Sequence, residues 1–195
     1  MKRQRGASDL SKGEIARERI LAAAETIIVD KGVAALTFDE VSEQTGLSKG
    51  GILHHFSSKD ALVRAMVERF VSLFETGLAG LETHDEAAAG RYTRAYVGAT
   101  LGNATSTGPQ YDRLGAAITA ALHNFPDLLL IVRQQNIRCQ TGVENDGLDP
   151  VLATIIRLAT EGLWLAEVFD VMRLDPKMKS AVVARLMEWT HPAKS

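Results

Sequence analysis

Apolar residues recur three and four positions apart over most of this chain, and almost no stretch alternates with a period of two. The first spacing lines one face of a helix with apolar side chains, whereas alternation is the pattern of a half-buried strand. The sequence therefore predicts an all-α protein. We expect helices at about 11–31, 37–46, 48–56, 58–76, 87–102, 110–124, 126–143, 149–172 and 176–190.

Polar residues stand where helices are expected to begin, and glycines where two of them are expected to end. Ser11 with Glu14, and Thr37 with Glu40, have the spacing of a capping box, in which both side chains bind free backbone N–H groups. Further cap residues, terminal glycines and first-turn prolines are Gly32, Gly46, Ser48, Ser57, Ser58, Pro126, Asp149, Pro150, Asp175 and Pro176. These signals give the predicted boundaries.

Residues 37–56 are two short predicted helices joined by the turn Thr45-Gly46-Leu47. A glycine-containing turn of this length is typical of the DNA-binding helix-turn-helix, whose second helix enters the major groove. That second helix contains Gly50 and Gly51, each of which costs on the order of 1 kcal/mol of helix stability relative to alanine. Close approach of the helix backbone to another surface explains them better than helix stability does.

The side chains of the second helix divide between an outer surface and a core. We expect Lys49 to contact a phosphate or a guanine edge and Leu53 to touch a thymine methyl group. Ile52 and Phe56, four residues apart, are expected to face the core. Nearby, Lys59 is placed to meet phosphate together with the free amides of the next helix, the alternative being a solvated lysine.

His54 and His55 have two interpretations. Metal ligation normally requires further ligands at helical or loop spacing, and neither H-E-x-x-H nor C-x-x-C accompanies them. We therefore expect one histidine to pack and the other to contact phosphate, with no metal and no cofactor bound.

Residues 11–70 resemble the N-terminal domain of the tetracycline-repressor (TetR) family. The resemblance rests on a first helix ending in Lys-Gly, then residues 36–41 (LTFDEV), 45–50 (TGLSKG), 55–56 (HF) and 59–62 (KDAL), in that order. It implies an all-α homodimer with a DNA-reading N-terminal domain and a larger C-terminal domain that binds a small effector and dimerises. Where the family usually has a tyrosine, this chain has Leu53, which favours an apolar base contact there.

The resemblance and the pattern together give a domain organisation and a set of DNA-binding residues. We expect a basic, disordered arm at 1–10, a helix-turn-helix domain at 11–57, a connector helix at 58–76, and an effector-binding and dimerisation domain at 77–195. The candidate DNA-binding residues are Thr37, Ser48, Lys49, Gly50, Gly51, Leu53, His54, His55 and Lys59.

Charge is distributed unevenly along the chain. The formal net charge is −2. However, the first 69 residues carry +1 and the remainder −3, and the first twelve hold four basic residues against one acidic residue. This places positive potential at the N-terminal end, where a phosphate backbone would use it, although a basic start is also common in soluble tails.

The C-terminal part resembles the family less closely. Gly162-Leu163-Trp164, then Leu174-Asp175-Pro176 and a last helix, resemble a closing helix pair that implies a four-helix bundle with the twin subunit. For the dimer interface we name Leu152, Ile155, Leu163, Val168, Val182 and Leu186. For the effector pocket we name aromatic and polar residues that are able to line a cavity, with core packing or surface exposure as the alternative: Tyr92, Tyr96, Tyr111, His123, Phe125, Arg133, Asn136 and Trp164.

Two other classes of protein fit less well. An enzyme is disfavoured because the sequence has no nucleophile elbow, no glycine-rich phosphate loop and no metal-ligand spacing, and a pure interaction bundle leaves Gly50 and Gly51 unexplained.

Cys139 is expected to be a buried thiol rather than a reactive one. The longest aliphatic run, 128–132, is far too short to span a bilayer, and residues 1–10 lack the apolar stretch of a signal peptide, so we expect a cytoplasmic protein. The expected function is ligand-responsive transcriptional regulation: a repressor that releases a palindromic operator on double-stranded DNA when a small molecule binds.

Overall fold

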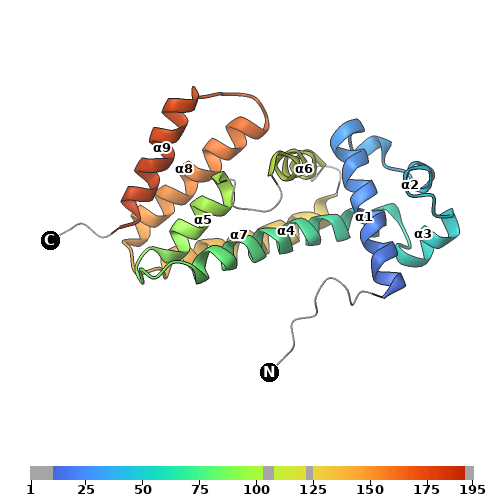
Figure 1. Cartoon of the computed structure of the whole chain (residues 1–195), viewed down its shortest axis with the longest axis horizontal. Coiled ribbons are helices and arrows are strands. Elements are labelled where there is room, and N and C mark those ends of the chain that lie inside the picture. The colour runs from blue at the N-terminus through green and yellow to red at the C-terminus, as the bar shows by residue number, and fades with distance from the viewer. Residues whose placement is uncertain (1–10, 103–107, 122–124, 192–195) are drawn as a thin grey trace. The chain divides into compact units, whose positions relative to one another are not determined.

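The computed structural model describes residues 11–102, 108–121 and 125–191, and within these ranges the regular elements are all helical (Figure 1). This confirms the all-α prediction. The helices are α1 (Lys12–Lys31), α2 (Phe38–Thr45), α3 (Lys49–His55), α4 (Lys59–Thr83), α5 (Arg91–Leu101), α6 (Gly108–Ala121), α7 (Leu129–Glu144), α8 (Pro150–Val168) and α9 (Pro176–Trp189), with short 3₁₀ turns η1 (Val33–Ala35) and η3 (Pro126–Leu128). Among the described helices, none is long and apolar enough to cross a membrane.

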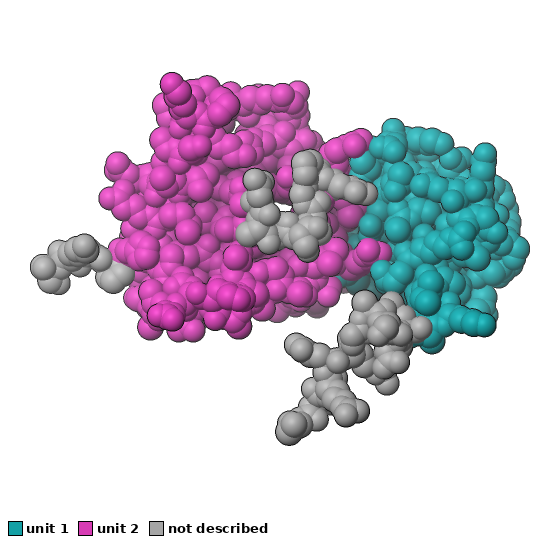
Figure 2. Space-filling view, in the orientation of Figure 1, with its two compact units in different colours: residues 1–68 teal, residues 69–195 magenta. Residues whose placement is uncertain are grey.

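The chain divides into two compact units, Met1–Glu68 and Arg69–Ser195 (Figure 2). Helix α4 is continuous across the boundary and supplies residues to both. It runs to Thr83, whereas the sequence pattern predicts a loop from Gly77. The helix continues because Leu78 and Leu81 extend its apolar stripe and pack in the core of the second unit beside Tyr96.

The first unit is a three-helix domain, to which the start of α4 is added. Its core contains Ile20, Ala24, Ile27 and Ile28 of α1, as the helical spacing predicts, together with Val41, Ile52, Phe56 and Leu62 from the other helices. Ser11 and Glu14 form the predicted capping box, and Thr37 accepts a hydrogen bond from the Glu40 N–H. Gly46 ends α2 with φ of 68°, a left-handed conformation that favours glycine. The short turn that follows sets the direction of α3 relative to α2.

The second unit packs α5 against α7, α8 and α9, while α6 also contacts α8. One cluster joins α4, α5 and α7 around Tyr96 and Cys139, and another joins α5, α8 and α9 around Val97, Ile156 and Leu186. Asp149 and Asp175 cap α8 and α9, each followed by the predicted first-turn proline. Helix α5 is thus covered on two sides, by α7 and by the α8–α9 pair.

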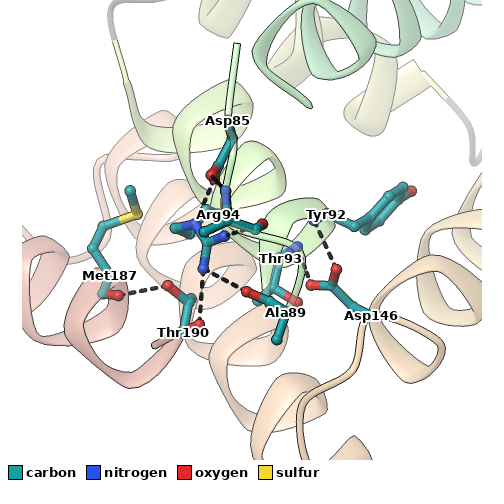
Figure 3. A network of polar contacts seen from close by, with 9 residues as sticks. Asp85, Ala89, Tyr92, Thr93, Arg94, Asp146, Met187 and Thr190 are labelled. Atoms are coloured by element: carbon teal, nitrogen blue, oxygen red, sulfur yellow. Dashed lines mark hydrogen bonds and ion pairs between the residues drawn. The ribbon is translucent and has the colours of Figure 1, made fainter. Parts of the chain in front are cut away.

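A polar network centred on Arg94 fixes one end of the second unit (Figure 3). The buried guanidinium pairs with Asp85 and donates to the carbonyl oxygens of Ala87, Ala89 and Thr190. Arg94 therefore ties the start of α5 to the preceding loop and to the end of α9. Gly90 completes the junction, because a Cβ atom there would lie 2.1 Å from the Thr190 oxygen.

Candidate DNA-binding and effector sites

Helix α3 presents its first turn on the surface of the first unit. Ser48 caps it by accepting a hydrogen bond from the Gly51 N–H at 3.1 Å, and Ile52 and Phe56 anchor its other face in the core as predicted. Lys49, Gly50 and Leu53 are exposed, Leu53 to 42%. The exposed face carries the candidate base-contacting residues, and the buried face fixes their orientation.

Gly50 has no structural role that requires a glycine. A Cβ atom built on it would meet nothing within 4 Å, and its φ is not positive. Packing within the domain therefore does not explain why a residue that weakens a helix stands here. An external surface that approaches the backbone closely does explain it.

The charged candidates near α3 have partners within the chain. The Lys49 ammonium lies 2.9 Å from the carboxylate of Asp39 on α2. The Lys59 ammonium donates to the Val33 carbonyl at 3.0 Å, which ties the start of α4 to η1. Thr37 is a helix cap whose hydroxyl oxygen accepts from the Glu40 N–H, which leaves its O–H able to donate. Their roles toward DNA stay predictions.

The histidine pair lies at the end of α3. His54 is exposed and His55 is half-buried, and their rings meet edge to face with centroids 5.6 Å apart. Within the described ranges no group of three His, Cys, Asp or Glu side chains is placed to hold a metal ion. The assignment of one packing and one phosphate-contacting histidine is therefore compatible with these positions and stays untested. The basic arm 1–10 lies outside the described residues.

Three of the effector candidates lie around one cluster of the second unit, Tyr96 buried, Tyr92 half-buried and Asn136 exposed at its edge. Tyr92 and Tyr96 of α5 pack with Cys139, and Asn136 accepts a hydrogen bond from Arg157 at 2.6 Å. Burial raises the pKa of both tyrosines well above the ordinary value of 10.0. It also raises the pKa of the Cys139 thiol, consistent with the predicted unreactive cysteine.

Arg157 and Glu161 are the central charges of this cluster, and neither is among the residues expected from the sequence. Arg157 is 6% exposed, donates to Gln140 at 2.8 Å and pairs with Glu161 at 2.7 Å, while the Tyr96 hydroxyl donates to Glu161. The Nε atom of Arg157 is buried and has no hydrogen-bond partner in the described structure. The sequence signal for this pair was two opposite charges four residues apart in a largely apolar helix.

Tyr111 and Trp164 belong to a second, more apolar group. The Tyr111 ring stacks on Phe70 with centroids 4.3 Å apart, and its hydroxyl donates to the Phe70 carbonyl. The Trp164 indole donates to Asp112 at 3.0 Å. Of the remaining candidates, Phe125 is half-buried and Arg133 is exposed, while His123 lies outside the described residues. Among the described candidates, Tyr92 and Tyr96 thus belong to one cluster and Tyr111 and Trp164 to another, and their roles toward an effector stay predictions.

A cavity of about 680 Å³ lies beside Tyr92 and is largely open to solvent. Its volume lies in the range of small-molecule sites, although such sites usually enclose more of their ligand. Its charged lining includes Glu82, whose carboxyl pKa is raised by burial and by the nearby Asp146. Asp146 itself accepts hydrogen bonds from the Tyr92 and Thr93 N–H groups (Figure 3). Tyr92 therefore lies between this cavity and the buried cluster.

The dimer candidates separate into core and surface. Leu163 and Leu186 are buried within the chain, Leu152 and Val182 pack against the α5–α8–α9 core, and Val168 is half-buried, while Ile155 is 49% exposed. The exposed apolar residues of α8 instead lie at helical spacing on the same side as Ile155, and α9 adds two more. They are Val151, Ile155, Leu158 and Leu165 on α8, Phe169 at its C-cap, and Met178 and Trp189 on α9, which we call the α8–α9 apolar face.

Two family models match the chain. Residues 20–66 match the model of bacterial regulatory proteins of the tetR family, and residues 90–191 match that of the tetracyclin repressor-like C-terminal domain. The transcriptional regulator TtgR of Pseudomonas putida is 30% identical over 121 residues, 62% of this chain and 46% of TtgR. The transcriptional activator FasR of Mycolicibacterium smegmatis is 37% identical over 62 residues, 32% of this chain and 28% of FasR. The chain thus spans less than half the length of these relatives.

Solved structures share the fold. A transcriptional regulator from Rhodococcus sp. Rha1 has a TM-score of 0.72 at 20% identity, with 90% of this chain and 95% of that chain covered. The multidrug binding protein EbrR, solved with malachite green, has a TM-score of 0.64 at 22% identity, with 90% and 98% covered. The family model of the C-terminal domain alone matches more than half of the sequence, and the family model of the N-terminal domain matches the helix-turn-helix before it. The chain therefore belongs to the TetR family of DNA-binding transcriptional regulators.

Proposed function

We propose that the chain is a homodimeric repressor that binds a palindromic operator through α3 and releases it when a small molecule occupies the second unit. The observation that carries the DNA-binding part is the exposed first turn of α3. It presents Lys49, the backbone at Gly50 and Leu53 together, on a helix whose other face is anchored in the core. Such a surface fits the edges of base pairs in the major groove.

The α8–α9 apolar face supports the homodimer. Four large apolar side chains of α8 and Phe169 at its C-cap are exposed at helical spacing, and a Cβ atom built on Gly162 among them would meet nothing within 4 Å. Contiguous exposed apolar surface marks an interaction site, and a second copy of the same face is complementary to it in a two-fold dimer. Such a dimer presents two α3 helices to half-sites one helical turn apart, about 34–36 Å.

The cluster around Arg157 supports an internal ligand site. Arg157 Nε is a buried donor without a partner in the described structure, and Tyr92 connects this cluster to the cavity of about 680 Å³. A small molecule with an acceptor atom would satisfy the donor, since unpaired buried polar groups are costly. EbrR, a multidrug binding protein that shares this fold, was solved with malachite green and with ethidium, which supports small-molecule binding by this chain.

Linkage between two states of the dimer would connect the sites. Residues 58–76, at the start of the long helix α4, would hold the recognition helices at a spacing that fits the operator in one state and not in the other. A ligand shifts this equilibrium only by its difference in affinity for the two states. Release therefore requires that the ligand bind the operator-incompatible state more tightly.

The test is a fluorescence titration of the protein against the DNA upstream of its own gene. We expect salt-sensitive, sequence-selective binding, because phosphate contacts release counterions. Metabolites that raise the melting temperature are then added to the complex, and an effector should dissociate it. Absence of selective binding both there and on selected random DNA would overturn the proposal. A promoter fusion that loses expression without the protein would show an activator instead.

A further inference from the structure

The sequence of α3 contains a single permanently charged side chain, Lys49, and that charge is paired. Its ammonium lies 2.9 Å from one Asp39 carboxylate oxygen and 3.0 Å from the other. Asp39 belongs to the first turn of α2, so the two short helices of the helix-turn-helix are joined by this pair. Both side chains are largely exposed, Lys49 to 54% and Asp39 to 77%.

This pair has little to do with stability. Exposed ion pairs contribute about 0–1 kcal/mol, and the anchoring of α2 and α3 comes from Val41, Ile52 and Phe56 in the core. The pair lies beside Gly50, where the absence of a side chain leaves the surface open. It therefore places a donor group and an acceptor group next to each other on the face that points away from the core.

We propose that the Lys49–Asp39 pair reads one G·C base pair in each operator half-site, an inference that rests on the proposed DNA-binding function. Guanine presents two adjacent acceptors, N7 and O6, in the major groove, and its cytosine presents the N4 amino donor. Lys49 carries donors only and ionised Asp39 carries acceptors only. Lys49 donates to guanine while Asp39 accepts from cytosine.

The other base pairs do not match this arrangement. In an A·T pair the adenine N6 donor stands between the two acceptors, and the thymine methyl group occupies the groove beside them. Asp39 has a second effect, because its carboxylate neutralises Lys49 and repels phosphate. Contacts of Lys49 with the backbone of unrelated DNA are thereby weakened, so its contact with the base becomes more favourable than its contact with phosphate.

The experiment selects binding sites from random DNA with five proteins. They are the wild-type chain, Asp39→Ala, Lys49→Ala, the double variant and a control, each confirmed as folded by its melting temperature. Glu43→Ala is the matched control, since Glu43 is an exposed carboxylate on the same helix that is not part of the pair. Selected sites and single-base variants are then titrated at two salt concentrations.

We expect one G·C position per half-site in the wild-type sites. Asp39→Ala should reduce discrimination against the other base pairs there by about tenfold, within the range of one good base contact. It should also tighten binding to unrelated DNA. Glu43→Ala should leave the base preference unchanged. In the Lys49→Ala background, removing Asp39 should change discrimination much less, since the two act together.

The outcomes separate this inference from the function on which it rests. A wild-type protein that selects no sequence overturns the proposed function itself. A wild-type protein that selects sites, combined with an Asp39→Ala variant whose base preferences match those of Glu43→Ala, overturns the base-reading role and leaves DNA binding standing. Equal effects of Asp39→Ala in the presence and absence of Lys49 would likewise refute the paired contact.

Discussion

The two units of the chain place their functional groups in opposite ways. In the first unit the candidate residues of α3 are mostly exposed, while the core behind them is apolar. In the second unit the polar residues Tyr96, Arg157 and Glu161 bind one another inside the fold. An outward surface fits a large external partner, whereas an internal polar cluster fits a small ligand that the protein encloses. Under the proposed function, the first unit binds DNA and the second unit binds the effector.

The largest effect is expected from a charge on the α8–α9 apolar face. Leu158→Glu should weaken the dimer by about 100-fold or more, because two like charges face each other across a two-fold interface and like-charge juxtaposition costs several kcal/mol. Sedimentation equilibrium measures the loss, and operator affinity should fall with it.

The control for this substitution is Ile15→Glu, which alters an equally exposed apolar residue of the first unit. It should leave the dimer intact. A dimer that survives Leu158→Glu would show that this face is not the interface.

The next effect compares one cation in each unit. Arg157→Met should lower the free energy of unfolding by about 3 kcal/mol, because it leaves partners of a buried network unpaired. Lys49→Ala should change it by no more than about 0.5 kcal/mol, as is usual for exposed residues. Chemical denaturation measures both values. Equal losses of unfolding free energy in the two variants would show that the buried Arg157 and the exposed Lys49 contribute equally to stability.

A smaller effect has opposite signs for stability and for binding. Gly50→Ala should stabilise the first unit by up to about 1 kcal/mol, since alanine favours the helix and its Cβ meets nothing within 4 Å. It should nevertheless weaken DNA binding if the backbone approaches DNA there. Thermal unfolding and titration are measured on the same sample. Unchanged or tighter DNA binding would remove the reason we give for this glycine.

The smallest effect concerns the loop held by Arg94. The hydrogen bond from Arg94 lowers the pKa of the Asp85 carboxyl below its ordinary value of 3.8. A lowered pKa contributes stability above the ordinary value, and this contribution is lost as the pH falls through the folded-state value. Asp85→Asn should therefore make unfolding less sensitive to acid below about pH 4 than in the wild type. Identical pH profiles would show that Asp85 contributes nothing to acid sensitivity.

The sequence predicts the first unit better than the second. Helix caps, the turn at Gly46 and the buried positions of Ile52 and Phe56 follow from local rules, and the structure confirms them. The end of α4 beyond Gly77 does not, because Leu78 and Leu81 become a buried stripe only when α5 and α7 pack against them.

The second unit also shows why apolar residues alone do not identify an interface. Leu163 and Ile155 look alike in the sequence, yet one is buried by the chain's own helices and the other is exposed. Only the direction of α8 relative to α5 and α9 separates them. Likewise, Arg157 is recognisable as part of a site only when Tyr96 and Asn136 from other helices surround it.

The central claim, that the exposed first turn of α3 binds DNA, is tested most directly by the salt dependence of DNA affinity for wild type and Lys49→Ala. We predict salt-sensitive, selective binding by the wild type. Lys49→Ala should bind its selected site about tenfold more weakly, while remaining dimeric and equally stable. If the two proteins bind that site with equal affinity at every salt concentration, the surface that reads DNA lies elsewhere on the molecule.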